Sequence, residues 1–324
     1  MKRRALILLL GAAAIAPRLA FAARTYRIYM ATWRGVTDVE KGFQDRLARR
    51  GVPVEYIWRD AGQDPSKLPG FVREIQQARP DLVYAWGTSA TLGVAGRYDA
   101  PTPIASPVVF ALVAQPVAAM IVPRLKNQGR DVTGVYHVAS IAAQLEAMGA
   151  YRPFTKVGVL FNRGEANSVG IVDELRTELR RRQQQLVEAT FETDASGRPS
   201  PDGIEERVRK IREAGAQWLY LGPDSYLTTQ IDRVAAAATQ AKLPTFATTE
   251  ALMDAPVLAG LFCGYRAVGE FAAYKAEQIL VGGKRARDVP VETLTRFAFV
   301  VRVDVARALE ILPPITLFDY AEFR

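Results

Sequence analysis

The sequence predicts an α/β protein built from two similar lobes, each with a parallel sheet covered by helices. Its 324 residues exceed what one hydrophobic core usually organises, so two domains are expected. Apolar strands alternate with helical patterns along both halves, which favours parallel sheets covered on both faces. Four strands, two in each half, run through a polar loop into a helix, at Thr32, Gly87, Asn162 and Gly222. Open α/β sheets hold small ligands at such junctions, so the halves are expected to face each other across a ligand.

The first 22 residues are predicted to be a secretory signal peptide. The basic residues 1–4 precede an apolar run, Ala5 to Ala16, and Ala20-Phe21-Ala22 is an A-x-A cleavage signal. Pro17-Arg18 interrupts the run before it reaches the roughly 20 apolar residues of a membrane span. Cleavage after Ala22 and export to the periplasm are therefore expected, with an uncleaved anchor as the alternative.

The composition gives little support for a nucleic-acid or metal partner. The net charge of +8 falls to +4 once the four basic residues of the signal peptide are removed, which is a weak argument for nucleic-acid binding. Cys263 stands in an apolar run and is expected to be a small buried residue. His137 is the one histidine and cannot build a metal site alone. Neither a metal nor another cofactor is expected.

In the first half, the pattern predicts five strands and four helices. Strands are recognised as short apolar runs rich in β-branched residues, and helices by apolar residues three and four positions apart. The predicted strands are Tyr26 to Met30, Val52 to Trp58, Leu82 to Trp86, Pro107 to Leu112 and Asp131 to Tyr136, of which the last is interpreted as the first crossing between lobes. The predicted helices are Val36 to Arg50, Phe71 to Ala78, one that follows Gly87 and includes Thr91 to Arg97, and Val117 to Leu125.

The second half repeats the alternation. The predicted strands are Val157 to Phe161, Leu186 to Phe191, Trp218 to Leu221, Pro244 to Thr248, Leu258 to Gly264 and Phe297 to Val303. The predicted helices are Ile141 to Tyr151, Val169 to Arg182, Ile204 to Ala214, Thr228 to Ala241, Val268 to Val281 and Val305 to Ile311. Residues 193–202 are predicted to be a surface loop. The last strand arrives after a complete set of five, which suggests that the chain crosses between the lobes more than once.

Five blocks of the sequence carry a family resemblance: residues 107–117, 129–135, 161–168, 221–225 and 267–283. Together they resemble the substrate-binding proteins of ABC transporters with the type I periplasmic-binding fold, in the branch named for tryptophan and other aromatic amino-acid uptake. The resemblance covers nearly the whole mature chain, and Asn162-x-x-Glu165-x-Asn167-Ser168 is its most specific part.

The resemblance implies two Rossmann-like lobes, joined by crossing hinge strands, that close on a ligand. On this basis the N-terminal lobe is expected to comprise residues 23–136 plus 264–290. The C-terminal lobe is expected to comprise residues 137–263 plus 291–324.

The sequence departs from the family pattern in two places. Gln115 precedes Pro116 where the family usually has an acidic residue, so a charge that could face a ligand amine is missing. The loop of residues 32–35 also lacks the His-Pro type pattern of the aromatic amino-acid binders. These departures leave the ligand open, and Gln115 stays a candidate contact.

Hydroxyl side chains at helix starts are candidates for holding a ligand carboxylate. Thr88 and Ser89 follow Gly87 at one helix start, and Ser168 lies at another. The N–H groups of a first helical turn are unpaired and attract anions. The alternative is that Ser89 and Ser168 are only N-caps, each contributing about 1 kcal/mol to its helix.

Two acids are candidates for receiving a ligand ammonium, largely on the family pattern. Glu165 and Asp224 are expected on facing loops, where charge-assisted hydrogen bonds are strong once water is excluded. The alternative is that Glu165 bonds to its own helix terminus and that Asp224 caps the helix beginning near Tyr226.

Aromatic side chains are candidates for the walls of the cleft. Ligand pockets are often lined by aromatic residues, and Trp33, Trp86 and Tyr265 are placed for this, although an aromatic at a strand end, as Trp86 is, more often belongs to the core. Arg34 could pair with a ligand carboxylate or stay solvated, and the sequence leaves both open.

The expected function is that of the exported solute-binding component of an ABC importer. It would act as a monomer, capture an amino acid or related carboxylate between the lobes and deliver it to an inner-membrane permease. A periplasmic sensory module for a membrane signalling protein is the main alternative. An enzyme is less favoured because the sequence has no G-x-S-x-G elbow, P-loop or metal cluster, and no catalytic residue is assigned.

Overall fold

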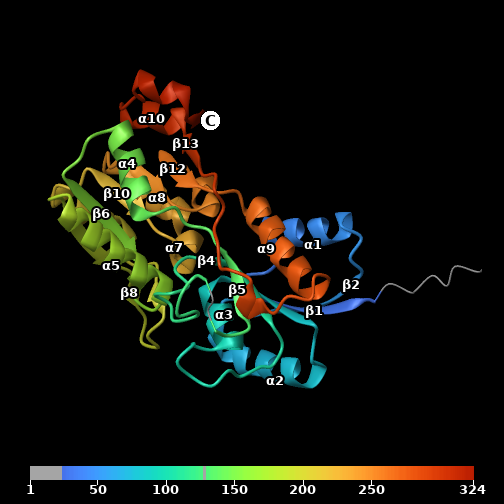
Figure 1. Cartoon of the computed structure of the whole chain (residues 1–324). Coiled ribbons are helices and arrows are strands. Elements are labelled where there is room, and N and C mark those ends of the chain that lie inside the picture. Colours follow the sequence, from blue (N-terminus) through green and yellow to red (C-terminus); the bar gives the residue numbers. More distant parts are fainter. Residues whose placement is uncertain (1–23, 127–128) are drawn as a thin grey trace, which may run out of the picture.

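The computed structural model describes residues 24–126 and 129–324 and contains two α/β lobes (Figure 1). The predicted signal peptide, with its cleavage site at Ala22, lies outside the described residues. Within these two ranges, no helix combines the length and the apolar character needed to cross a bilayer.

The first lobe is built on a five-stranded sheet in which every pair of neighbours is parallel. The strand order β2-β1-β3-β4-β5 is that of a doubly wound sheet, whose ligand site lies where the order reverses between β1 and β3. The strands are β1 (Tyr26–Thr32), β2 (Val54–Asp60), β3 (Leu82–Trp86), β4 (Val108–Val113) and β5 (Val132–Tyr136).

Helices cover both faces of this sheet. A capping box between Thr37 and Glu40 starts α1, and Arg79 in the left-handed conformation ends α2 before Pro80. Helices α1 and α9 pack so closely that a Cβ atom on Gly269 would lie 1.8 Å from the carbonyl oxygen of Val39. The helices are α1 (Asp38–Arg49), α2 (Leu68–Ala78), α3 (Gly87–Ala95) and α9 (Tyr265–Leu280), with a 3₁₀ turn, η1 (Pro65–Lys67), before α2.

The second lobe is built on a seven-stranded sheet in the order β14-β13-β12-β11-β10-β6-β7. Read from the β7 edge, the first five strands follow the relative order of the first lobe, and they are parallel. The strands are β6 (Lys156–Phe161), β7 (Gln185–Thr190), β10 (Trp218–Leu221), β11 (Thr245–Ala247), β12 (Ala259–Phe262), β13 (Ala298–Val301) and β14 (Glu322–Phe323).

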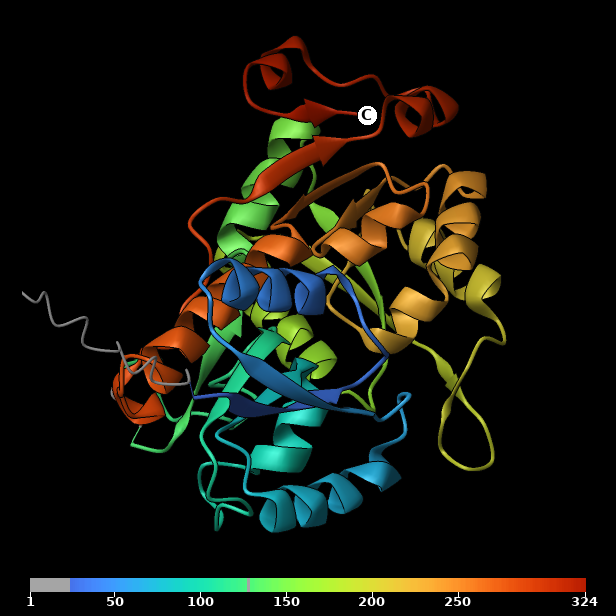
Figure 2. The ribbon, with the colours of Figure 1, turned by 90° about the vertical axis from the view of Figure 1, so that its right-hand side faces the viewer.

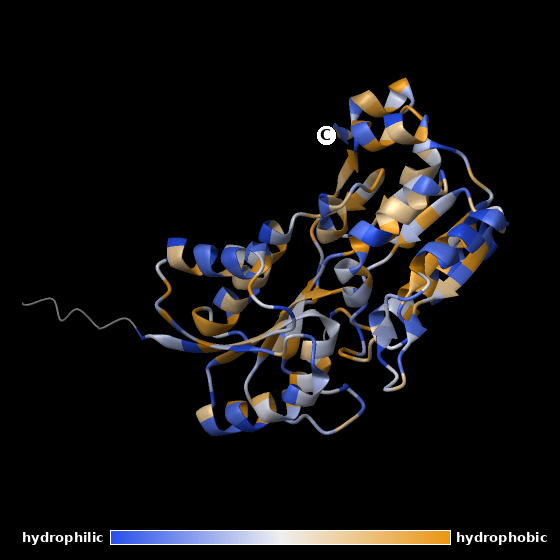
Figure 3. Cartoon of the chain, turned by 180° about the vertical axis from the view of Figure 1, so that it is seen from behind, coloured by the Kyte–Doolittle hydropathy of each residue, from blue (hydrophilic) through white to orange (hydrophobic). Residues whose placement is uncertain are grey.

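Two buried clusters hold helices on the two faces of the second sheet. One contains side chains of α4, α5 and α10, and the other those of α6 and α8. Figure 3 shows apolar strands inside and hydrophilic outer faces on the helices. The helices are α4 (Ile141–Tyr151), α5 (Ala166–Arg181), α6 (Ile204–Glu213), α7 (Ser225–Thr229), α8 (Ile231–Gln240) and α10 (Val303–Leu309), with 3₁₀ turns η2 (Glu250–Asp254), η3 (Ala286–Asp288) and η4 (Ile315–Asp319).

The chain passes between the lobes three times, which confirms the expected joined arrangement (Figure 2). The crossings lie between β5 and α4, between β12 and α9, and between η3 and β13. We call these three crossing segments the waist. Because they lie side by side, the lobes can move relative to one another only by bending at the waist.

Three predictions about single elements are wrong. Residues 117–125 form hydrogen-bonded turns instead of a helix, because Met120 has a φ of 60° and Pro123 follows. The strand predicted at residues 131–136 is present as β5 (Val132–Tyr136), but it lies inside the first sheet and is not itself the crossing, which begins after it. The predicted helix from Thr228 to Ala241 is two helices, α7 and α8, that meet at Gln230.

Two further features were not expected. Strand β13 runs antiparallel to β12, so the second sheet is not wholly parallel. The predicted loop 193–202 carries most of a small hairpin, β8 (Glu192–Thr193) with β9 (Pro199–Ser200).

Candidate ligand-binding cleft

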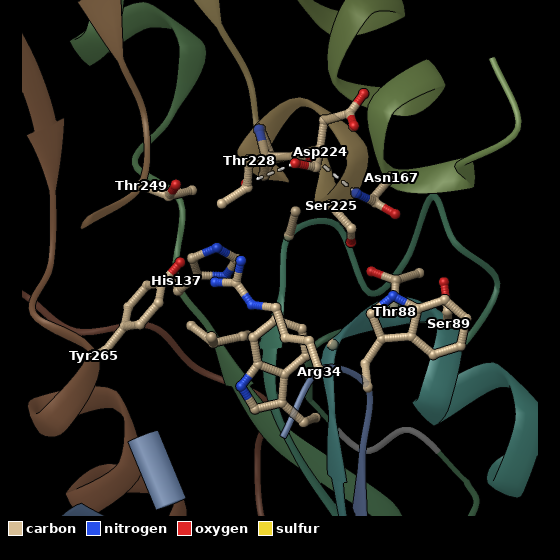
Figure 4. A pocket seen from close by; sticks show the side chains of 16 residues that line it. Arg34, Thr88, Ser89, His137, Asn167, Asp224, Ser225, Thr228, Thr249 and Tyr265 are labelled. Carbon is tan, nitrogen blue, oxygen red and sulfur yellow. Dashed lines mark hydrogen bonds between the residues drawn. The ribbon is translucent and has the colours of Figure 1, made fainter. Parts of the chain in front are cut away.

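A cleft lies between the lobes at the carboxyl ends of the strands in both sheets, where doubly wound sheets bind ligands (Figure 4). The first lobe contributes the loop after β1, the start of α3 and the end of β4. The second contributes the starts of α5 and α7 and the loop after β11. The lining residues are Trp33, Arg34, Trp86, Gly87, Thr88, Ser89, Leu112, Ala114, His137, Asn167, Pro223, Asp224, Ser225, Thr228, Thr249 and Tyr265.

Local backbone geometry aims two of these segments into the cleft. Gly87 has a φ of +76°, so the chain turns directly from β3 into α3 and brings the first-turn N–H groups to the cleft wall. Leu112 has a φ of 55° at a bulge in β4, and this bulge turns both Leu112 and Ala114 toward the cleft.

Arg34 brings a positive charge to the first-lobe wall of the cleft. Its guanidinium carbon lies 5.0 Å from the centre of the Trp86 ring, in a cation–π contact. Within residues 24–126 and 129–324, no ion pair involves Arg34, and its buried Nε has no hydrogen-bond partner. A ligand anion could therefore pair with the Arg34 guanidinium without displacing a protein carboxylate from an ion pair.

Asp224 brings a buried carboxyl group to the opposite wall, and no basic side chain of the described residues forms an ion pair with it. Its oxygens accept hydrogen bonds from the N–H groups of Leu227 (2.8 Å) and Asn162 (2.7 Å) and from the Ser168 hydroxyl (2.5 Å). Burial, followed by the nearby Glu165 carboxylate, raises the pKa of Asp224 to about 7. These donors all belong to the second lobe, so the carboxyl group is turned away from the open space of the cleft (Figure 4).

Two other polar side chains in the cleft are buried with an unpartnered atom. His137 is 5% exposed, and burial, with a smaller contribution from Arg34, lowers its pKa to about 4, so the ring is neutral at neutral pH. Its Nδ1 has no hydrogen-bond partner, and neither has Nε1 of Trp33, which is 8% exposed. Buried polar atoms without partners are rare, so both are candidates for ligand contacts.

Five of the eight predicted site residues line the cleft. Trp33 precedes Arg34 in the loop after β1, Thr88 and Ser89 lie in the first turn of α3, Asp224 caps α7, and Tyr265 begins α9. Ser89 is not an N-cap, since α3 starts two residues earlier.

The other three predicted residues lie outside the cleft lining. Both oxygens of Glu165 accept hydrogen bonds from the start of α7, from Ser225 N (2.9 Å) and Tyr226 N (3.0 Å). Ser168, inside α5, donates to Asp224. Gln115 points away from the cleft and donates to Glu174. Glu165 and Ser168 thus position α7 and Asp224, which are themselves part of the cleft.

Several lining residues were not among the predicted ones. The sequence leaves the role of Arg34 open, and it assigns His137 neither a metal nor a catalytic role. Trp86, for which the sequence favours the core over the cleft wall, is both buried and part of the wall. Asn167 lies in the most specific family block, which could have pointed to it; its amide donates to the Pro223 carbonyl at 2.7 Å.

The cleft is narrow. The volume that the centre of a water molecule can reach inside it is about 50 Å³, room for a few waters. A larger solute must therefore displace side chains or part the lobes. In the described part of the chain, no group of three or more His, Cys, Asp or Glu side chains is placed to hold a metal ion.

A family model and a curated relative both match most of this chain. Residues 32–322 match the family model described as ABC transporter substrate binding protein. A protein of Clostridioides difficile (strain R20291) named tyrosine-binding protein is 26% identical over 271 residues, which cover 83% of this chain and 74% of that relative.

Solved structures share the fold. A conserved domain protein from Vibrio cholerae superposes with a TM-score of 0.81 at 22% identity, over 93% of this chain and 100% of that one. An ABC domain from Streptococcus pneumonia in complex with L-Trp superposes with a TM-score of 0.76 at 22% identity, over 91% of this chain and 99% of that one. Because the family model spans both lobes and the cleft between them, the chain belongs to the ABC transporter substrate-binding proteins.

Proposed function

We propose that this protein captures a small amphoteric solute, an aromatic amino acid or a related carboxylate, between its lobes and delivers it unchanged to an ABC permease. The observation that carries the proposal is a pair of residues without an ion pair among the described residues: Arg34, which reaches into the cleft, and Asp224, which lines the opposite wall with its carboxyl group turned toward Ser168 (Figure 4). A zwitterion has the matching charges, a carboxylate for Arg34 and an ammonium for Asp224.

The carboxylate pole has three kinds of donor. The guanidinium of Arg34 offers planar N–H groups that fit a carboxylate, and the first turn of α3 adds backbone N–H groups beside the hydroxyls of Thr88 and Ser89. Anions are stabilised at such a helix start without any catalytic group.

The aromatic preference rests on the walls and on the relatives. Trp33, Trp86 and Tyr265 line the cleft and offer flat apolar surface to a ring. One relative is named as a tyrosine-binding protein, and one structure of the same fold is a complex with L-Trp. Both support an aromatic amino acid as the first ligand to test.

The cellular setting is part of the same proposal. Residues 1–22 would be removed after Ala22, and the mature chain would work as a periplasmic monomer with lobes 23–136 plus 264–290 and 137–263 plus 291–324. The alternative partner is a membrane signalling protein, which would use the same cleft. Capture of permease subunits by the ligand-loaded protein would favour transport, and capture of a membrane kinase instead would favour sensing.

The test is calorimetric titration of the mature chain with L-tyrosine, L-tryptophan and two analogues that each lack one pole. Tyramine lacks the carboxylate and 3-(4-hydroxyphenyl)propionate lacks the ammonium. The amino acids are expected to bind at least about tenfold more tightly than either analogue, because each lost pole leaves a buried group unpaired. Mass spectrometry of the released ligand should recover it unaltered.

Arg34→Ala is expected to weaken binding of the amino acids by at least about thirtyfold, since truncating one partner of a buried charge pair costs about 2 kcal/mol or more. Arg97→Ala is the matched control, because Arg97 is an exposed arginine of the same lobe paired with Asp99. Equal affinity of Arg34→Ala and the parent protein would overturn the assignment of the carboxylate pole.

A further inference from the structure

A second pocket lies behind the cleft, on the other side of the crossing segments. It measures about 610 Å³ on the same scale that gives about 50 Å³ for the cleft. We call it the rear pocket. Ala114 lines both spaces, whereas Gln115 and Val138 face only the rear pocket and His137 faces only the cleft. The waist of the molecule therefore separates two sites.

The rear pocket has walls from both lobes. The turns after β4 supply Val117 and Leu125, α5 supplies Ile171 and Glu174, and the third crossing supplies Phe297. Most of the remaining lining is also apolar, with Ala114, Pro116, Ala118, Tyr136, Val138 and Ala139. A site of this size with few polar groups suits the apolar body of a small molecule.

The rear pocket contains one acidic side chain and two polar atoms without a hydrogen-bond partner. Glu174 is the one charged residue of the lining, and its Oε2 accepts a hydrogen bond from the Gln115 amide. The Oε1 atom of Gln115 and the hydroxyl of Thr293 have no hydrogen-bond partner. A ligand head that donates several hydrogen bonds and carries positive charge would complement this set.

We propose that the rear pocket binds an amphipathic primary amine, with its ammonium group at Glu174 and Gln115 and its apolar body against Val117, Leu125 and Phe297. The ammonium replaces the Gln115 amide as the donor to Glu174. The released Gln115 amide can then turn its Oε1, which now lies against Gly170, toward the ammonium.

The site is coupled to the movement of the lobes. The bond between Gln115 and Glu174 joins the segment after β4 to α5 of the second lobe. An occupant that takes over this bond contacts both lobes at the waist, so its affinity depends on how far they are closed. Burial raises the pKa of Glu174, and an ammonium group beside it would offset that cost.

The probe is 2-phenylethylamine, compared with 2-phenylethanol and 3-phenylpropionate, which share the ring and differ in the head. Binding is followed by methyl NMR of the mature chain carrying Asp224→Asn, so that the cleft offers no carboxylate to the amine. The amine is expected to shift the methyl signals of Val117, Leu125 and Ile171 and to bind at least about tenfold more tightly than the alcohol, as expected for a charge-assisted hydrogen bond.

Two variants test whether the amine binds at Glu174 and inside the rear pocket. Glu174→Gln should remove the preference for the amine while leaving binding of the alcohol unchanged, and Ala118→Trp, at an exposed position of the pocket wall, should abolish binding of both. Glu178→Gln is the control, because Glu178 lies one turn further along α5, pairs with Arg181 and Arg182 and does not line the pocket. Shifts confined to cleft residues, equal affinity for amine and alcohol, or an unchanged preference in Glu174→Gln would each overturn the proposal.

Discussion

Two charged residues of the cleft, Arg34 and Asp224, have no ion-pair partner among the described residues. Each nevertheless has close neighbours. Structural acids and bases in folded proteins are normally paired when buried. Asp224 is 3% exposed and accepts from the N–H groups of Leu227 and Asn162 and from the Ser168 hydroxyl, so the fold holds it rigidly without a basic partner among the described residues.

The raised pKa of Asp224 predicts that affinity depends on pH. Without ligand, the carboxyl group takes up a proton below its pKa of about 7, whereas an ammonium ligand requires the ionised form. Binding therefore releases a proton, and the affinity for L-tyrosine should fall by about tenfold per pH unit below about pH 6 and level off above about pH 8. Titration calorimetry in buffers of different ionisation enthalpy measures both quantities.

Asp224→Asn should bind more weakly at neutral pH and lose this pH dependence. Asp232→Asn, an exposed aspartate of α8 in the same lobe, should keep the parent profile. An Asp224→Asn variant with the parent affinity and slope would mean that the ammonium pole lies elsewhere.

The sequence allowed part of this site to be predicted. Thr88 and Ser89 could be predicted because strand ends and helix starts converge in a doubly wound sheet, Trp33 and Tyr265 because pockets are often aromatic-lined, and Asp224 largely from the family resemblance; all five line the cleft. The state of Arg34 could not be predicted, because whether an arginine has an acidic partner depends on the whole fold. Glu165 was expected to face the ligand, yet its carboxylate accepts from the backbone N–H groups of Ser225 and Tyr226, a tertiary contact that no local pattern reveals.

At the scale of elements, α9 is tied to the third crossing by a buried lysine. Lys275 is 1% exposed, and its ammonium group donates to the Pro290 carbonyl (2.6 Å) and to Glu292 (2.7 Å). Burial lowers the pKa of Lys275, although Glu292 works in the opposite direction. This contact fixes the place where the chain leaves the first lobe for the last time.

Lys275→Met is expected to lower the free energy of unfolding by about 2 kcal/mol. The methionine fills similar space, but the hydrogen bonds of a charged donor to Pro290 and Glu292 are lost, and such bonds contribute about 1.5–3 kcal/mol each at most. Urea denaturation followed by circular dichroism measures the change. Lys284→Met, which removes an exposed lysine bonded to Gln278, should change the stability by less than about 0.5 kcal/mol. Equal stability of Lys275→Met and the parent would show that the contact is dispensable.

Helices whose apolar residues recur every three or four positions could be predicted from the sequence. Helix α9 was expected from Val268 to Val281 and runs from Tyr265 to Leu280, because its apolar residues repeat along one face. Residues 117–125 show similar apolar content but no helix, since Met120 adopts a positive φ that a methionine rarely takes. Such a conformation depends on the turn hydrogen bonds to Gln115 and Pro116, which only the folded chain supplies.

At the scale of the whole molecule, two doubly wound sheets of the same strand order face one another. The alternation of strands and helices predicted both parallel sheets and their opposition. The direction of β13 could not be predicted, because it depends on the side from which the third crossing enters the second sheet. The same crossing supplies Thr293 and Phe297 to the rear pocket, so the waist was the part least accessible from the sequence.

The narrowness of the cleft predicts that the lobes part before a ligand enters. About 50 Å³ of reachable volume holds a few waters, whereas an aromatic amino acid needs several times that space. The described conformation leaves no room for such a ligand, so the protein should also populate a more open one from which binding starts.

Fluorescence energy transfer between labels on the two lobes tests this expectation. Gln63→Cys and Ser196→Cys place labels at exposed positions of the first lobe and of the β8–β9 hairpin. The native Cys263 should stay unlabelled, because it is buried and burial raises the pKa of its thiol to about 12. Adding L-tyrosine should raise the transfer efficiency and remove the low-transfer population, while a pair within the second lobe, Arg180→Cys with Ser196→Cys, should show no change. If L-tyrosine binds while the efficiency between lobes stays constant, the ligand enters by local side-chain movement and hinge closure is not the capturing step.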